Sequence, residues 1–87
     1  MESKEKHPGL ILKKVIEDRK INKSLFANDI GIKPSNLSEI FSGKRMISAT
    51  TSLYIERALS IDAEYWLGLQ MKHNLSVARD KISNLNK

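Results

Sequence analysis

Apolar residues recur at helical spacing in short stretches of this chain, and a glycine or a polar turn closes each stretch. In the first stretch, Pro8 suits the opening turn of a helix, and apolar side chains follow at positions 11, 12, 15 and 16. No stretch alternates apolar and polar residues for long, as a half-buried strand would. The spacing therefore predicts an all-α domain of short helices with close connections.

Two of the predicted helices are very short and are separated only by residues 31–34. Asn22 is expected to cap the first of the two, and Gly31 to end it, because glycine tolerates the left-handed backbone that follows a helix. Ser35 is expected to cap the second, and Gly43 to end it. The inward side chains are predicted to be Leu25, Phe26, Ala27 and Ile30, followed by Leu37, Ile40 and Phe41.

Helices joined this tightly need a small residue at their crossing and a positive φ in the turn, and Ala27 and Gly31 supply both. The second helix then anchors by its apolar side and leaves its polar side free. That arrangement is typical of a helix-turn-helix unit, predicted here over about residues 22–43, whose second helix reads DNA. An ordinary helical hairpin with a solvated polar face is the alternative.

The free polar side carries short side chains that can reach base edges or phosphates. Asn36, Ser38 and Glu39 are the expected base readers, since an amide pairs with adenine and a carboxylate accepts from cytosine N4. Lys44 and Arg45 follow directly and are expected to contact phosphates. The full set of predicted DNA-binding residues is Lys23, Lys33, Ser35, Asn36, Ser38, Glu39, Ser42, Lys44 and Arg45.

The charge of the chain favours an anionic partner. Fifteen Lys and Arg against ten Asp and Glu give a formal charge of +5, which indicates nucleic acid first and an anionic membrane surface second. No apolar run approaches the roughly 20 residues that span a bilayer, and no signal-peptide pattern opens the chain. We therefore expect a cytoplasmic protein that does not enter the membrane.

The residues of this chain do not form a recognisable catalytic or metal-binding pattern. There is no cysteine, which excludes disulfides, thiolate metal sites and cysteine nucleophiles. His7 and His73 have no Asp or Glu spaced to complete a site, and His7 is expected to cap or pack against the first helix. We expect no enzymatic activity, no metal and no cofactor.

The rest of the chain predicts two further helices. Their expected caps are Ser48 or Thr50, with Ser52, Ile55, Ala58 and Leu59 facing inward, and then Asp62, with a helix from Ala63 to about Asn84. Trp66 is expected to fill the core between the helix-turn-helix and this last helix, rather than a partner pocket. The prediction is thus a single domain of five helices spanning residues 1–87.

The last predicted helix carries an apolar stripe at steps of three and four residues: Leu67, Met71, Leu75, Ala78, Ile82 and Leu85. A stripe this long exceeds what a small domain needs for its own core, so it indicates an interface for a second copy or another protein. Alternatively, the helix folds back over the first helix and covers the stripe itself.

Residues 21–61 resemble the Cro/repressor-type (XRE) helix-turn-helix family. The resemblance lies in Phe26-Ala27, Ile30-Gly31-Ile32, Pro34-Ser35, Leu37-Ser38, Ile40 and Gly43-Lys44-Arg45. Nearly the whole chain resembles HigA-type antitoxins, through His7-Pro8-Gly9, Ile11-Leu12, Ile47-Ser48, Ala63-Glu64-Tyr65-Trp66-Leu67, Leu69-Gln70, Leu75 and Ala78-Arg79. Three residues depart from the family pattern: Lys23, Ser60 and Glu39, the last of which leaves the base preference open.

The resemblance implies a lambda-repressor-like five-helix domain with an extended C-terminal helix. It implies a cytoplasmic homodimer that binds an inverted-repeat operator, represses its own operon and neutralises a small ribonuclease toxin. A stand-alone helix-turn-helix regulator without a toxin is the second hypothesis. The third is a protein-binding module whose C-terminal helix carries the function and whose helix-turn-helix is vestigial.

Overall fold

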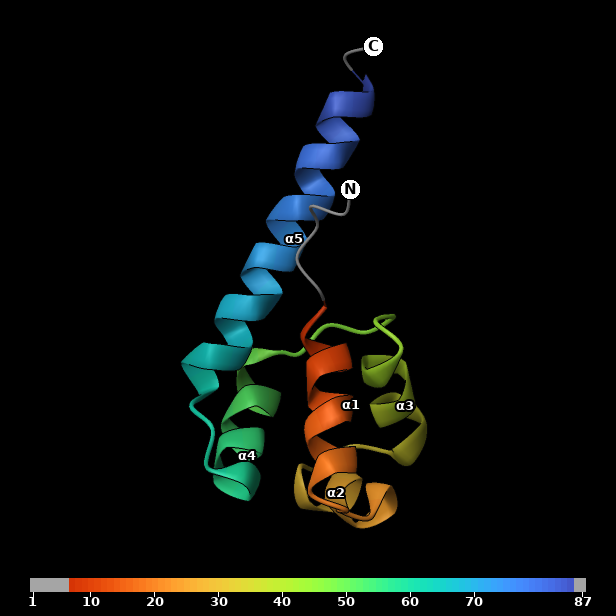
Figure 1. Cartoon of the computed structure of the whole chain (residues 1–87), viewed down its shortest axis with the longest axis vertical. Helices are drawn as coiled ribbons and strands as arrows, with labels where there is room; N and C mark the ends of the chain where they lie inside the picture. The colour runs from red at the N-terminus through yellow and green to blue at the C-terminus, as the bar shows by residue number, and fades with distance from the viewer. Residues whose placement is uncertain (1–6, 86–87) are drawn as a thin grey trace.

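The computed structural model describes residues 7–85, all of whose regular structure is helical. The five helices are α1 (Pro8–Asp18), α2 (Lys23–Asp29), α3 (Pro34–Phe41), α4 (Ala49–Leu59) and α5 (Ala63–Leu85). Helices α1–α4 form the body of the domain, and α5 runs along one side of that body and projects well beyond it (Figure 1). This confirms the predicted all-α fold and its extended last helix.

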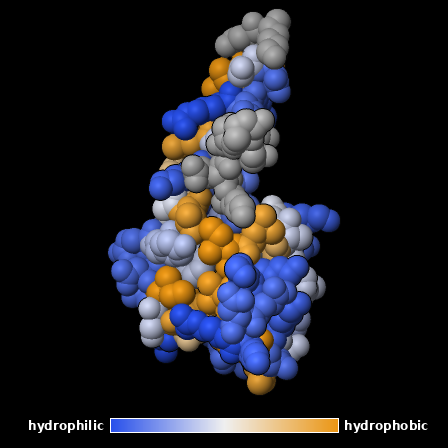
Figure 2. All heavy atoms as spheres, viewed as in Figure 1, coloured by the Kyte–Doolittle hydropathy of each residue, from blue (hydrophilic) through white to orange (hydrophobic). Residues whose placement is uncertain are grey.

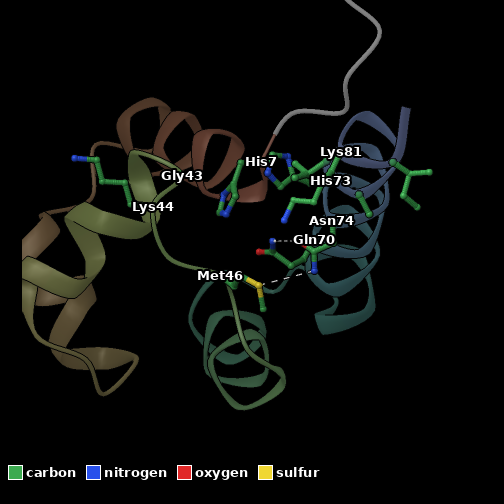
Figure 3. A pocket seen from close by; sticks show the side chains of 11 residues that line it. His7, Gly43, Lys44, Met46, Gln70, His73, Asn74 and Lys81 are labelled. Carbon is green, nitrogen blue, oxygen red and sulfur yellow. Dashed lines mark hydrogen bonds between the residues drawn. The ribbon is translucent and has the colours of Figure 1, made fainter. Parts of the chain in front are cut away.

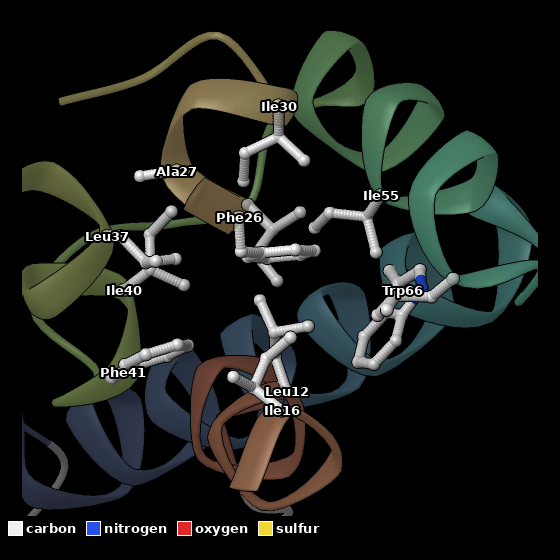
Figure 4. Packing of buried hydrophobic residues seen from close by; sticks show 12 residues of the cluster. Leu12, Ile16, Phe26, Ala27, Ile30, Leu37, Ile40, Phe41, Ile55 and Trp66 are labelled. Atoms are coloured by element: carbon white, nitrogen blue, oxygen red, sulfur yellow. The ribbon is translucent and has the colours of Figure 1, made fainter. Parts of the chain in front are cut away.

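The core is built around Phe26 of α2, with Leu12 from α1, Ile55 from α4 and Trp66 from α5 close to it (Figure 4). Trp66 is 0% exposed, which confirms the prediction that it packs inside. The buried apolar cluster draws on all five helices and comprises Leu12, Ile16, Phe26, Ala27, Ile30, Leu37, Ile40, Phe41, Ile47, Ile55, Leu59 and Trp66. One shared core therefore holds every helix.

Helices α1, α2 and α3 all end in the same hydrogen-bonded turn. After α3, the Gly43 N–H donates to the Ile40 carbonyl and the Lys44 N–H to the Glu39 carbonyl, with Gly43 at φ +83°. This pair of hydrogen bonds defines the Schellman motif, which places one left-handed residue just past the helix. Gly31 serves α2 at φ +73°, as predicted, whereas Lys20 takes the left-handed position after α1 at φ +58°.

The predicted N-caps are partly right. Asn22 Oδ1 accepts from the Leu25 N–H, and Ser48, the first of two candidates, accepts from the Thr51 N–H. The prediction for Ser35 is wrong, because α3 already begins at Pro34, whose fixed φ suits the first helical position. The N-cap residue is Lys33, which makes no side-chain capping bond.

Two of the predicted inward residues lie at the surface. Leu25 is 65% exposed because α2 has only seven residues and turns a single narrow side, with Phe26 and Ala27, into the core. Ala58 is also exposed, since the buried stripe of α4 runs through Ser52, Ile55 and Leu59. The other predicted inward residues of α2, α3 and α4 are buried.

Helix α5 is tied to the body by polar contacts as well as by Trp66. The Ala63 N–H at its start donates to Glu56 Oε1 of α4 at 3.0 Å. Farther along, Gln70 Oε1 accepts from the Ile47 N–H at 2.9 Å, in the connection before α4. These bonds anchor the first two turns of α5, and its later turns extend away from the body.

The first turn of α1 packs directly against the last turn of α3. A Cβ atom added to Gly9 would overlap with the carbonyl oxygen of Ile40. Just before it, His7 caps α1, with its Nδ1 accepting the Gly9 N–H at 2.9 Å, which confirms the capping role predicted for this histidine. Glycine at position 9 therefore sets how closely α3 is held.

Gly9→Ala is expected to lower the free energy of unfolding by at least about 1–3 kcal/mol, because two backbones must separate to admit the methyl group. Gly68→Ala is the matched control: a Cβ at Gly68, within α5, meets nothing within 4 Å. That variant is expected to gain about 1 kcal/mol from helix propensity. Urea denaturation measures both, and equal stabilities for the two variants would contradict the close approach.

Candidate nucleic-acid interface

Helix α3 presents one polar face to solvent. Leu37, Ile40 and Phe41 point into the core and hold the helix from behind (Figure 4). The residues predicted to contact DNA lie on the other side: Ser35, Ser38, Glu39 and Ser42 are exposed, and Asn36 is half-buried. The helix is thus a short rod with an anchored apolar side and a free polar side, as a recognition helix requires.

The basic residues predicted around this face are exposed and come from both sides of α3. Lys33 stands immediately before the helix, and Lys44 and Arg45 stand in the turn after it. Lys23 opens α2, where its Nζ lies 5.9 Å from the centre of the Phe41 ring. The structure therefore gathers all nine predicted residues on or beside one helix.

A basic residue that sequence reasoning missed lies at the same surface. Lys13 of α1 lines a shallow hollow of about 170 Å³ together with Lys23, Ser38, Phe41 and Ser42. The sequence around Lys13 does not indicate a DNA contact, because its pattern predicts only an amphipathic helix. The packing of α1 against α3 brings it there, so that Lys13 joins the cationic rim of the face.

Glu39 and Arg45 are bonded to each other. The Arg45 Nε and Nη2 atoms both lie 2.8 Å from Glu39 Oε1, and both side chains remain about half exposed. Sequence reasoning assigned these residues separate roles, as a base reader and a phosphate contact. In the structure they form one unit on the polar face.

A second, less polar groove lies away from α3, between the start of α1, the turn after α3 and helix α5 (Figure 3). It has a volume of about 520 Å³. The rings of His7 and His73 meet edge to face there, with centroids 4.9 Å apart. Burial lowers the pKa of His7 below its usual value, and the neighbouring His73 lowers it further.

The apolar stripe of α5 is not folded back over α1. Its later members lie on the part of the helix that projects beyond the body: Met71, Leu75 and Ile82 are 59%, 43% and 57% exposed, and Leu85 is 77% exposed. Figure 2 shows apolar side chains spaced along this projecting part. The structure therefore supports the interpretation in which the stripe is an uncovered surface.

Neither a metal cluster nor a membrane span is found within residues 7–85. No three His, Asp or Glu side chains there come together as metal ligands would. No helix in the same range is long and apolar enough to cross a bilayer.

The chain belongs to the helix-turn-helix family, whose model matches residues 12–66. It is 39% identical over 79 residues to virulence-associated protein A′ of Dichelobacter nodosus, covering 90% of this chain and 69% of that protein. Among solved structures it is similar to a candidate antidote protein of a plasmid maintenance system from Nostoc punctiforme. The TM-score is 0.90 at 26% identity, over 97% of this chain and 92% of that one.

The fold is also shared with the Pseudomonas aeruginosa antitoxin HigA, solved with the higBA promoter. That match has a TM-score of 0.86 at 22% identity and covers 97% of this chain and 92% of that one. Together these comparisons confirm the predicted resemblance to HigA-type helix-turn-helix antitoxins.

The His7 pair makes the stability of the domain dependent on pH. Because the folded state lowers the pKa of His7, the unfolded chain binds a proton more readily, and stability falls as pH drops below the ordinary histidine value of about 6.5. Protonation of Nδ1 also removes the acceptor for the Gly9 N–H. His7→Asn keeps a capping acceptor without a titrating group, so it is expected to lose less stability than the parent between pH 8 and pH 5.5 in urea denaturation. Equal losses would contradict this assignment.

Proposed function

We propose that this protein is a DNA-binding antitoxin that represses its own toxin–antitoxin operon and neutralises a small ribonuclease toxin. The observation that carries the DNA-binding part is the exposed polar face of α3, rimmed by lysines and an arginine, in a chain of the helix-turn-helix family. Similarity to an antidote protein and to HigA supports the antitoxin part.

In the proposed complex, α3 lies in the major groove and the basic residues around it hold the backbone. Lys33, Lys44 and Lys23 extend from the edges of the face, where each can neutralise a phosphate. Ser35, freed from any capping duty because the helix begins at Pro34, offers its hydroxyl to a phosphate near the start of the helix. These contacts fix the register of the protein on the duplex.

Sequence preference in this proposal comes from the middle of α3. Asn36 carries an amide that can pair bidentately with adenine, and its half-buried position restricts its rotamers. Ser38 and Ser42 lie one turn apart, with hydroxyls that either donate or accept. The Ser42 hydroxyl donates to the Glu39 carbonyl, which leaves its oxygen lone pairs for a donor on the DNA.

We further propose that the protein acts as a homodimer. The exposed stripe of α5 supplies an uncovered apolar surface of helical period, which a second copy of the same helix can cover. Two α3 helices in such a dimer would enter successive major grooves about 34 Å apart, so the operator should be an inverted repeat.

The toxin is proposed to bind on a surface other than α3. Exposed apolar side chains also lie on α1 and α4, at Leu10, Leu53 and Tyr54, and either surface offers a place for a partner. Residues 1–6 are a further candidate surface for the toxin, and they lie outside the residues that the structure describes.

Lys44→Ala is expected to weaken binding to every duplex by a similar factor and to lower the salt slope by about one unit, because one phosphate contact is lost. Lys72→Ala, which removes the same charge from α5, is the matched control and should leave the slope unchanged. Fluorescence anisotropy over a series of salt concentrations measures both. An unchanged slope in Lys44→Ala would mean that the turn after α3 does not touch the backbone.

The antitoxin role is tested by a search for a small open reading frame directly beside the gene, co-expression and co-purification with its product, and a footprint on the upstream DNA. A stable complex and a protected inverted repeat are expected. A footprint without a partner would support the stand-alone regulator instead, and a partner without a footprint would support the protein-binding module.

A further inference from the structure

The turn after α3 folds back over the exposed face of that helix. The backbone N–H groups of Lys44 and Arg45 donate to the Glu39 carbonyl at 2.8 and 3.3 Å, and the Ser42 hydroxyl donates to the same oxygen at 3.1 Å. Gly43, at φ +83°, makes this reversal possible. The Arg45 side chain therefore starts directly beside Glu39 and on the polar face.

The carboxylate of Glu39 engages one edge of the Arg45 guanidinium. Nε donates to Oε1 at 2.8 Å, and Nη2 lies 2.8 Å from the same oxygen in an ion pair. The N–H groups on Nη1, and the Nη2 N–H that points away from Glu39, take no part in this contact. Among the described residues, Glu39 is the partner of this guanidinium, and the Arg45 side chain is 49% exposed. This leaves the outer edge, with parallel N–H groups on Nη1 and Nη2, available to a ligand.

That outer edge has the geometry of a base reader. Two parallel N–H donors match the O6 and N7 acceptors that guanine presents in the major groove. A phosphate contact gains less from this arginine than from a lysine, since the adjacent carboxylate cancels its charge and repels a phosphate. The contact also orders the long side chain before binding, which reduces the entropy lost on recognition.

We propose that Arg45 reads a guanine through N7 and O6, and that Glu39 is the positioning residue that aims it. The proposal rests on the proposed DNA-binding function and gives it a specific base. It replaces the two roles that the sequence indicated, a phosphate contact for Arg45 and a cytosine acceptor for Glu39. An ion pair this exposed adds little to folding stability, so its variants are expected to fold normally.

Selection from a random duplex library, followed by sequencing of the bound fraction, gives the preferred site of the parent chain even where the operator sequence is unknown. We expect one guanine per half-site whose preference disappears in Arg45→Ala, a loss of about 5- to 150-fold for a bidentate contact. Lys44→Ala is the matched control in the same turn and should retain the consensus. Circular dichroism and thermal melting confirm that each variant is folded.

Glu39→Gln separates positioning from charge. With an amide in place of the carboxylate, Arg45 gains a free charge, and its bond to residue 39 weakens because a neutral carbonyl oxygen is a weaker acceptor. Binding to unselected DNA should therefore tighten while the guanine preference falls. A loss of fold would lower both quantities together. Replacement of the selected guanine by 7-deazaguanine removes N7 alone, and it should weaken the parent while leaving Arg45→Ala unaffected. Inosine keeps N7 and O6 and should bind the parent as guanine does.

Different results would overturn the proposed operator binding and the proposed guanine contact of Arg45. If the parent enriches no sequence at all, the proposed operator binding is wrong and the guanine contact with it. If the parent enriches a consensus that Arg45→Ala retains, while that variant loses about one unit of salt slope, Arg45 contacts a phosphate and only this inference fails. If 7-deazaguanine has no effect on the parent but Glu39→Gln loses a cytosine preference, the carboxylate itself is the reader.

Discussion

No helix of the body could stand alone. Helices α1–α4 have 11, 7, 8 and 11 residues, and isolated helices shorter than about 12–15 residues are marginal in water. Their stability must come from the apolar cluster around Phe26, to which every helix contributes. The position of α3, and hence of any residue on its outer face, is thus a consequence of burying Leu37, Ile40 and Phe41 in a core shared with distant parts of the chain.

Backbone contacts add to the buried core in fixing the position of α3 and of the turn that follows it. The approach of Gly9 to the Ile40 carbonyl holds the first turn of α1 against the last turn of α3. The Schellman turn at Gly43 then directs the chain back over Glu39 before it continues to Ile47, which Gln70 fixes to α5. A short series of contacts therefore links the long last helix to the turn that carries Lys44 and Arg45.

The polar face combines two kinds of side chain that would serve different ends in the proposed DNA recognition. Exposed lysines at its rim provide charge without sequence information, and their long stems tolerate imprecise docking. Hydrogen bonds hold the polar atoms of Ser42 and of the Glu39–Arg45 pair in place, and the other serines and Asn36 have short side chains with few rotatable bonds. A protein in the proposed role of repressing its own operon must distinguish one promoter from all other DNA, which requires both kinds of contact.

Much of the fold follows from the sequence alone. Helical spacing, glycine after α2 and α3, and the caps Asn22 and Ser48 are local signals, and local sterics and hydrogen bonds enforce them wherever the chain goes. Composition and charge likewise predict the polar, basic character of α3 and its flanks. The prediction from the sequence was wrong where two local signals competed. Ser35 was expected to be the N-cap of α3, but the fixed φ of Pro34 starts the helix one residue earlier.

Only the tertiary structure decided which side chains meet. Lys13 reaches the polar face because α1 packs on α3, the α5 stripe stays uncovered because α5 projects from the body, and Glu39 binds Arg45 because a left-handed turn reverses the chain between them. Each of these depends on distances between residues that are remote in sequence or separated by a turn. Such distances are set by packing and backbone reversal rather than by residue type. The sequence therefore identified most of these residues, but neither Lys13 nor the pairing of Glu39 with Arg45.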